Sequence, residues 1–292
     1  MFDLKRIPEI EKAPECFRLL ERIPYAAEDA FPIQLSESVG DEIKLALLDV
    51  ETTGFTAGTH EIIEIGIVQI AYSPSARKIT AILEITSQFE QPTKAPISEL
   101  ITDITGITNE MVAGKRIDDA HIARILNSSL VVIAHNAVFD RGFIDLRFPV
   151  LSERLWACSI KDIDWLALGS ESNKLEYLLL KNGYFYDGHR AATDCLAMVV
   201  LFESVPTALP ELLQSSSKNS VKIVAKGVSY GDRETVKLRG YRWDADNKYW
   251  WIIMGEDKAI EEKLFLDDLC GNNKARNEFV LIKPSERYKT NG

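Results

Sequence analysis

Residues 45–70, with the sequence LALLDVETTGFTAGTHEIIEIGIVQI, decide the fold of this chain. The stretch begins with an apolar run, residues 45–48, of the kind that forms a central strand covered on both faces. Asp49 and Glu51 interrupt this run, and because side chains alternate along a strand, both carboxylates project to the same side. A Thr-Thr-Gly sequence then ends the strand.

Two like charges on a buried strand destabilise the fold unless a positive charge compensates them. No Lys or Arg lies next to Asp49 or Glu51 in the sequence. A divalent cation is one solution, and a strand end at which both acids reach solvent is the other. The local sequence leaves both interpretations open.

The length and charge of the chain limit the class of protein. With 292 residues the chain exceeds a usual single domain, which predicts one large core and a smaller module. The formal net charge of -10 argues against a protein that coats nucleic acid through a broad basic surface. An enzyme that binds metal ions through clustered acids is compatible with that charge.

The cysteines and the N-terminal sequence indicate a compartment. The four cysteines lie far apart and have no CxxC spacing, so neither a zinc site nor a disulfide framework is indicated. The N-terminal sequence carries charges where a signal peptide needs an apolar core, and no apolar run is long enough to span a bilayer. We therefore expect a cytoplasmic protein with no membrane partner.

The hydrophobic pattern predicts an α/β fold with a mixed sheet. Residues 61–72 and 78–86 alternate, and together with the first strand they predict a three-stranded antiparallel set. Further strands at 130–134 and 155–160 alternate with helices predicted at residues 97–105, 109–112, 117–126, 174–181 and 190–202, and with a helix that ends before Pro149. This order implies a sheet with helices on its faces.

Composition divides the chain into four parts. Residues 1–43 are rich in proline and are expected to form an N-terminal arm, whereas residues 44–205 form the α/β domain. Residues 206–220 have the most linker-like composition in the chain, PTALPELLQSSSKNS. Residues 221–292 combine alternating and helical patterns, which predicts a small α+β module.

Asp140, His189 and Asp194 lie at the ends of other elements of the predicted domain. An acid in the position of Asp140, early in a helix, commonly complements the helix dipole, but this carboxylate can also face the edge that holds Asp49 and Glu51. Asp194 enters an apolar helix face and therefore needs a partner. His189 lies in the loop before it, where a histidine is usually only exposed, and within a turn of this acid.

Four carboxylates and one histidine suit phosphodiester hydrolysis. Mg²⁺ and Mn²⁺ prefer hard oxygen ligands, and two such ions about 4 Å apart can activate water and stabilise both the attacking and the leaving oxygen. Histidine has an ordinary pKa near neutrality, so it can take the proton of the attacking water.

Three segments resemble the motifs of the DEDDh 3′→5′ exonuclease family. They are DVETTG at residues 49–54, HNAVFD at residues 135–140 and HRAATD at residues 189–194. Within this family the chain is especially similar to the proofreading epsilon subunit of bacterial DNA polymerase III. The resemblance covers residues 44–203 and implies a ribonuclease H-like mixed sheet flanked by helices.

The resemblance also implies a role for each matching residue. Asp49, Glu51 and Asp194 would hold one of two Mg²⁺ or Mn²⁺ ions. Asp140 would hold the second ion together with Asp49, and His189 would act as the general base. The positions that bind the substrate are matched by Thr52, Thr53, Phe55, Asn136 and Phe139.

The C-terminal module carries local positive charge in an acidic protein. Residues 218–250 contain eight Lys or Arg and four Asp or Glu, a balance of +4, and Trp243, Trp250 and the adjoining Trp251 fall in the same region. Such aromatic residues either stack on the bases of a single strand or fill the core of a small module. Alternation on a hairpin favours Trp250 inside the module, with Tyr249 or Trp251 as the better stacking candidates.

These observations predict a two-metal-dependent 3′→5′ exonuclease that hydrolyses DNA from a single-stranded 3′ end and releases nucleoside 5′-monophosphates. The five catalytic positions do not distinguish the two sugars, so an exoribonuclease acting on RNA or short oligoribonucleotides is an alternative. A non-catalytic nucleic-acid-binding subunit is another. We expect any role in replication or repair to depend on a polymerase or repair partner in trans.

Overall fold

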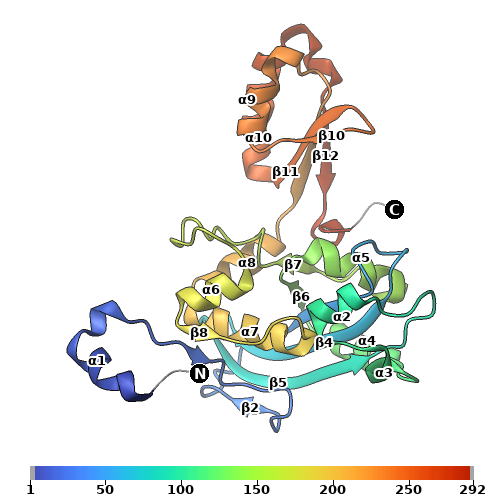
Figure 1. Ribbon diagram of the computed structural model, residues 1–292. Helices are drawn as coiled ribbons and strands as arrows, with labels where there is room; N and C mark the ends of the chain where they lie inside the picture. Colours follow the sequence, from blue (N-terminus) through green and yellow to red (C-terminus); the bar gives the residue numbers. More distant parts are fainter. Residues whose placement is uncertain (1–3, 290–292) are drawn as a thin grey trace.

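The computed structural model describes residues 4–289 and shows an α/β domain with a smaller module above it (Figure 1). The strands are β1 (Glu21–Arg22), β2 (Ile33–Gln34), β3 (Ile43–Thr52), β4 (Ile62–Ser73), β5 (Lys78–Phe89), β6 (Val131–Ala134), β7 (Trp156–Cys158), β8 (Tyr184–Phe185), β9 (Ser220–Ala225), β10 (Arg242–Asp244), β11 (Tyr249–Gly255) and β12 (Glu278–Ile282). The α-helices are α1 (Ile7–Lys12), α2 (Glu99–Thr105), α3 (Asn109–Val112), α4 (Asp119–Ser128), α5 (Ala137–Arg147), α6 (Leu175–Lys181), α7 (Ala191–Ser204), α8 (Ala208–Ser216), α9 (Arg233–Leu238) and α10 (Glu256–Cys270).

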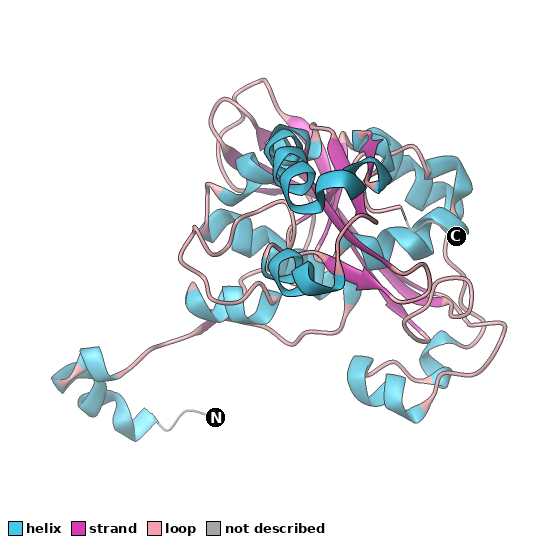
Figure 2. Cartoon of the chain, turned by 90° about the horizontal axis from the view of Figure 1, so that it is seen from above, coloured by secondary structure: helices cyan, strands magenta, loops and turns pink. Residues whose placement is uncertain are grey.

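The large sheet is mixed and has the order β2-β5-β4-β3-β6-β7. β4 pairs antiparallel with both β3 and β5, whereas β6 pairs parallel with β3 and β7 parallel with β6. The predicted mixed sheet and its three-stranded antiparallel set are therefore confirmed. Residues 45–48 of β3 are fully buried because β3 lies in the middle of the sheet and helices cover both of its faces (Figure 2).

Helices α6, α7 and α8 pack on one face of this sheet, and α4 and α5 pack on the other. α7 is apolar almost all round, as expected for a fully buried helix. Its first turn lies directly on β4 at Gly66, where a Cβ atom would come within 2.2 Å of the carbonyl carbon of Ala191. A glycine is needed for this close approach, which fixes the start of α7 against the sheet.

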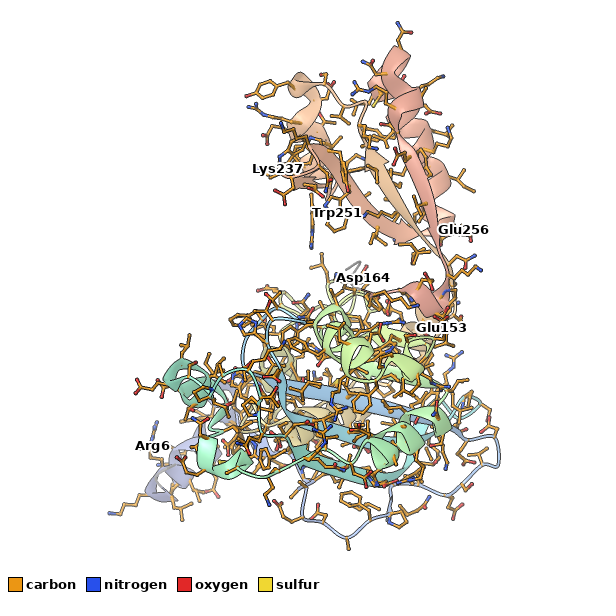
Figure 3. The ribbon with its side chains drawn as sticks, turned by 90° about the vertical axis from the view of Figure 1, so that its right-hand side faces the viewer. Arg6, Glu153, Asp164, Lys237, Trp251 and Glu256 are labelled. Carbon is orange, nitrogen blue, oxygen red and sulfur yellow. The ribbon has the colours of Figure 1, made fainter. Side chains whose placement is uncertain are left out.

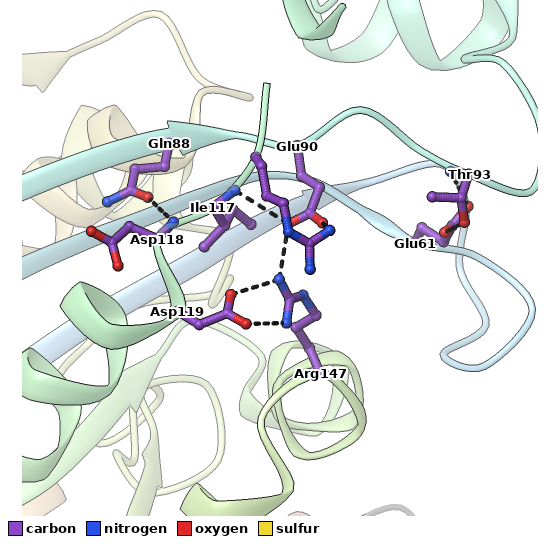
Figure 4. Close-up of polar contacts among 9 residues, drawn as sticks. Glu61, Gln88, Glu90, Thr93, Ile117, Asp118, Asp119 and Arg147 are labelled. Carbon is purple, nitrogen blue, oxygen red and sulfur yellow. Dashed lines mark hydrogen bonds and ion pairs between the residues drawn. The ribbon is translucent and has the colours of Figure 1, made fainter. Parts of the chain in front are cut away.

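Helix α5 is held by a sharp turn at its start and by ion pairs at its end. Asn136, the residue before the helix, has a φ of 103°. Arg147, in the last turn, pairs with Asp119 at 2.6 Å and with Glu90 at 3.2 Å (Figure 4). Glu90 follows β5 and also pairs with Arg116 at 3.0 Å. These contacts tie α5 to the start of α4 and the end of β5.

The N-terminal residues are only partly an arm. β1 pairs with β8 and β2 pairs with β5, so that residues 21–36 run along the main domain. α1 lies away from the rest of the chain in both views (Figures 1 and 2). The predicted arm of residues 1–43 therefore ends too late, because two-residue edge strands leave almost no pattern in a sequence.

The segment predicted as a linker, residues 206–220, is mostly helical. α8 occupies much of it, and Leu209 and Leu212 are buried in the core of the main domain. The serine-rich end of this helix is also packed, since Ser215 donates a hydrogen bond to Asp162 at 2.9 Å. The linker prediction is wrong for most of its range, because it followed composition alone.

The C-terminal module, residues 220–282, is a four-stranded sheet with the order β10-β11-β9-β12 and with its own core. Its two ends lie together, because Ser220 at the start of β9 pairs with Ile282 at the end of β12. The predicted α+β character is present, but β12 was missed, because the prediction stopped at the helix before it.

After the module the chain returns to the main domain. Arg287 is 9% exposed, bonds to Asp162, and donates to the Ser215 carbonyl oxygen at 2.7 Å. Arg141, which is fully buried in α5, donates to the carbonyl oxygens of Arg287 at 2.6 Å and of Ser285 at 2.7 Å. The predicted module of 221–292 thus extends too far, since residues 283–289 belong to the main domain.

Within residues 4–289, no single helix has the length and apolar content needed to cross a bilayer. Only the bent pair formed by α7 and α8 reaches both together, by length and composition, across an angle of 110°.

Candidate active site

Asp49 and Glu51 project from the end of β3 toward the first turn of α7. On the neighbouring strand β4, Asp49 is paired with Gly66 and Glu51 with Glu64. The absence of a side chain at Gly66 lets α7 approach, and this brings Asp194 to the same place. Carboxylate oxygens of Asp49, Glu51 and Asp194 all lie within 4.8 Å of one another. The structure therefore joins three of the four predicted metal ligands in one cluster, which we call the carboxylate cluster.

Asp140, the fourth predicted ligand, lies beside this cluster and is 2% exposed. Its Oδ1 atom accepts a hydrogen bond from the backbone N–H of Val50 at 3.2 Å. Val50 stands between Asp49 and Glu51 in β3, so the bond fixes the first turn of α5 against this strand. Asp140 is not among the three residues whose oxygens meet within 4.8 Å.

The burial and mutual proximity of these acids raise their pKa values. Burial, and then the charges of Asp140 and Asp194, raises the pKa of Asp49 well above its usual value. Burial and the charge of Asp194 raise the pKa of Glu51 to about 8, and burial raises the pKa of Asp140 to about 8. Burial also raises the pKa of Asp194. The protein stabilises these carboxylates poorly when they are charged, which is the condition that a bound divalent cation relieves.

Asp194 is oriented by two donors from the loop before α7. The hydroxyl of Tyr186 donates to its Oδ1 atom at 2.9 Å, and the backbone N–H of Arg190 donates to its Oδ2 atom at 3.1 Å. Two acceptor contacts on separate oxygens hold the carboxylate in one orientation. Tyr186 was missed in the sequence, because a tyrosine eight residues before an acid forms no recognisable motif.

His189 lies in the same loop, at the rim of the cluster. Its side chain is exposed and its φ is 64°, a left-handed backbone conformation that is uncommon for a residue other than glycine. The charge of His189 offsets part of the rise that burial causes in the pKa of Asp194. The predicted base and the predicted ligand therefore lie close to each other.

Glu64 anchors the loop that carries His189, and it was also missed in the sequence. It is fully buried, and it accepts from Arg190 at 3.1 and 3.2 Å, from the backbone N–H of Ala191 at 3.4 Å and from Ser87 at 2.6 Å. The available signal was a single acid inside the apolar run IIEIGIV. Arg190 is paired with Glu64, and its charge also offsets part of the rise in the pKa of Glu51.

The Thr-Thr-Gly-Phe turn after β3 is rigid and presents one aromatic ring. Thr52 donates to the Gly54 carbonyl oxygen at 2.6 Å, and Thr53 accepts from the backbone N–H of Glu61 at 3.0 Å. Phe55 at the tip is 78% exposed. A phenylalanine held outside the core in this way can contact a ligand, because no other part of the protein covers it.

Asn136 and Phe139 lie at the start of α5. Asn136 comes one turn before Asp140, and Phe139 is the residue next to it. Asn136 is exposed at the sharp turn, and Phe139 is half-buried with its ring centroid 5.1 Å from that of Phe143. The structure thus places Asn136 at the surface near the site and Phe139 in the packing of α5.

Part of the chain is similar in sequence to known bacterial proteins. The chain is similar to the DNA polymerase III PolC-type proteins of Clostridium perfringens, with 37% identity over 125 residues, and of Halalkalibacterium halodurans, with 30% identity over 176 residues. These matches cover 41% and 58% of this chain but only 8% and 11% of those proteins.

Among solved structures, exonuclease X in complex with 5′ overhanging duplex DNA matches 59% of this chain and 99% of its own, with 26% identity and a TM-score of 0.44. The sequence model of the exonuclease family RNase_T matches residues 47–202. This range runs from β3 to α7 and contains every residue of the candidate active site. The chain therefore belongs to this exonuclease family.

Proposed function

We propose that this chain is a 3′→5′ exonuclease that removes nucleoside 5′-monophosphates from the 3′ end of a single DNA strand. The observation that carries this proposal is the carboxylate cluster, in which Asp49, Glu51 and Asp194 meet within 4.8 Å at the end of the central strand of an exonuclease-family domain. Clustered carboxylates of raised pKa at a sheet edge are typical of a functional site.

The cluster suits Mg²⁺ or Mn²⁺, because its ligands are hard oxygens without sulfur or nitrogen among them. Asp49, Glu51 and Asp194 would hold one ion, and Asp140 with Asp49 would hold a second. Bound divalent ions stabilise negative charge on the phosphate oxygens and make water a stronger nucleophile.

His189 supplies the proton transfer in this proposal. The base takes a proton from the water that attacks the phosphorus atom, and the bond to the 3′ oxygen of the preceding nucleotide breaks. Three features hold this base in place: Asp194 a turn away, the ion pair between Arg190 and Glu64, and the contact of α7 with Gly66. The exposed position of His189 lets it return the proton to solvent after each turnover.

The terminal nucleotide would lie against the turn that follows β3. Thr52 is buried and donates its hydroxyl proton within the turn, so it shapes the site for the sugar rather than binds it. Thr53 only accepts a hydrogen bond in the turn, so its own O–H can donate to the substrate. Phe55 is free to pack on the terminal base. Asn136 is exposed directly before α5, four residues before Asp140, and we assign it to the substrate backbone.

The preference for DNA and for a polymerase partner rests on the similar proteins. The PolC-type relatives are DNA polymerases by name, and their matching segment is a small part of a much longer chain. We propose that this chain acts on DNA and works together with a polymerase. The cytoplasmic location, expected from the four cysteines, stays a prediction.

A comparison of strands tests this proposal. The protein is incubated with Mg²⁺ or Mn²⁺ and with 5′-labelled DNA and RNA strands of identical sequence, and Asp194→Ala serves as the inactive control. We expect stepwise shortening of DNA, faster than that of RNA, and none with the variant. Faster shortening of RNA would identify an exoribonuclease, and binding without shortening would indicate a non-catalytic subunit.

A further inference from the structure

The sheet of the C-terminal module has one covered face and one open face. Residues Val221, Ile223 and Ala225 of β9 point into the core that α9 and α10 complete, and Trp250 packs against this core from β11. Because side chains alternate along a strand, Tyr249 and Trp251 point to the opposite face.

The open face carries an aromatic row, and within residues 4–289 the helices of the module pack on the other face. Tyr249 and Trp251 are absent from the apolar core of the module, and Ile253, next on the same side of β11, is 49% exposed. The strand register places Trp251 between Arg242 on β10 and Val224 on β9. Figure 3 shows Trp251 in the module, apart from the main domain below it. Tyr249 and Trp251 are half-buried, so each of these two large rings keeps part of its surface exposed to another molecule.

Positive charges lie beside both rings. The ammonium group of Lys222 is 5.7 Å from the centre of the Trp251 ring, and the guanidinium of Arg242 is 5.8 Å from the same ring. Lys226 lies 5.8 Å from the Tyr249 ring and pairs with Glu278. Among the ion pairs of residues 4–289, none involves Lys222 or Arg242, so both cations beside Trp251 are available to an anion.

We propose that this open face binds single-stranded nucleic acid, with Trp251 and Tyr249 stacking on bases and Lys222 and Arg242 contacting phosphates. Both rings lie beside cations here, and the two cations at Trp251 make no ion pair in the part of the chain that the structure describes, a combination that suits the bases and phosphates of a single strand. A net charge of -10 makes most of the protein repel a polyanion, so a local cationic face has a particular value for substrate capture. The strand is the substrate of the carboxylate cluster, and in this respect the inference rests on the proposed function.

The module is connected so that it can act as a substrate clamp. Its two ends, Ser220 and Ile282, are paired with each other, and both continue into packed parts of the main domain, α8 and the tail at Arg287. Two chain segments hold the module next to the main domain, so a strand bound to the module has a raised local concentration at the active site.

The test measures binding and chemistry separately in the full-length protein. Binding of a fluorescent oligothymidylate of about 20 nucleotides, longer than one typical single-strand site, is followed by anisotropy in EDTA, so that hydrolysis does not occur. Hydrolysis of the p-nitrophenyl ester of thymidine 5′-monophosphate, in Mn²⁺, reports the carboxylate cluster without engaging the module.

Trp251→Leu keeps an apolar cover over Val224 but removes the stacking ring. We expect it to weaken strand binding about 5- to 150-fold, since stacking contributes roughly 1–3 kcal/mol per base. The double variant Lys222→Gln with Arg242→Gln should lower the slope of log affinity against log salt by about 1.4. Tyr230→Ala is the matched control, because Tyr230 is an 82% exposed aromatic residue of the module outside its sheet, and it should bind like the wild type.

Unchanged ester hydrolysis in variants that bind the strand weakly would support the inference. Wild-type affinity and salt dependence in both the Trp251 variant and the double variant would overturn it. A wild-type protein that binds the strand through Trp251 and yet hydrolyses neither strand nor ester would refute the proposed nuclease and leave the binding face in place.

Discussion

Glu51→Gln should stabilise the metal-free protein at high pH, because it removes a charge that the fold accommodates poorly. The pKa of Glu51 is raised from 4.5 to about 8 by burial and by Asp194. Between these two pH values the folded protein keeps a proton that the unfolded chain releases. The stability of the wild type therefore falls as pH rises through this window, at about 1.4 kcal/mol per pH unit.

Glutamine does not titrate, so the stability of Glu51→Gln does not fall with pH for this reason. The stability difference between Glu51→Gln and the wild type should grow by about 3 kcal/mol between pH 6 and pH 8 and then level off. Urea unfolding at several pH values in EDTA measures it.

Metal and a surface acid provide the controls. Mg²⁺ at saturating concentration should stabilise the wild type, because a ligand that binds only the folded state adds to its stability. It should stabilise Glu51→Gln less, because this variant lacks one of the carboxylates that would hold the ion. Glu110→Gln, at an acid whose pKa is lowered by a hydrogen bond from Thr108, should show no growth of this kind. A stability difference for Glu51→Gln that stays constant from pH 6 to pH 9 would refute the reasoning.

Three further predictions concern the tail, the module and the nucleotide turn. Arg287→Ala should lower the free energy of unfolding by about 3–5 kcal/mol, because it leaves the buried Asp162 without a positive charge to pair with, whereas Lys289→Ala at a more exposed pair should cost about 1 kcal/mol or less; urea unfolding of the two variants compares them. Replacing residues 220–282 by a short glycine turn should preserve the fold and ester hydrolysis, because the two ends already lie together, and anisotropy should show weakened strand binding. Loss of folding would contradict the view that the main domain folds without this module. Phe55→Ala should raise KM for a DNA strand about 5-fold or more in steady-state assays, since it removes a stacking surface; an unchanged KM would remove Phe55 from the substrate site.

The central part of the site was predictable because its chemistry conflicts with its local structure. Asp49 and Glu51 stand out as charges inside an apolar strand, and Asp194 as a charge in an apolar helix. The structure brings these three together, and it places Asp140 and His189 beside them. Burying these charges destabilises the fold, so their presence in apolar elements indicates a function, and this pattern can be recognised in the sequence.

The supporting residues were less predictable, because their partners lie far away in the chain. Glu64 meets Arg190 over 126 positions, and Arg287 meets Asp162 over 125. No periodic pattern links residues at such separations. The same reason explains the domain boundaries, since the return of the tail to Arg141 depends on tertiary contacts that composition does not encode.

A single measurement addresses the proposed activity most directly. A DNA strand labelled at its 5′ end is incubated with Mg²⁺ and either the wild type or Asp49→Ala, and the products are resolved by length and by nucleotide analysis. We predict a ladder that shortens from the 3′ end, with nucleoside 5′-monophosphates released by the wild type and an intact strand with the variant. An intact strand with both proteins, or equal shortening by both, would contradict the assignment of the carboxylate cluster as the site of 3′→5′ exonuclease chemistry.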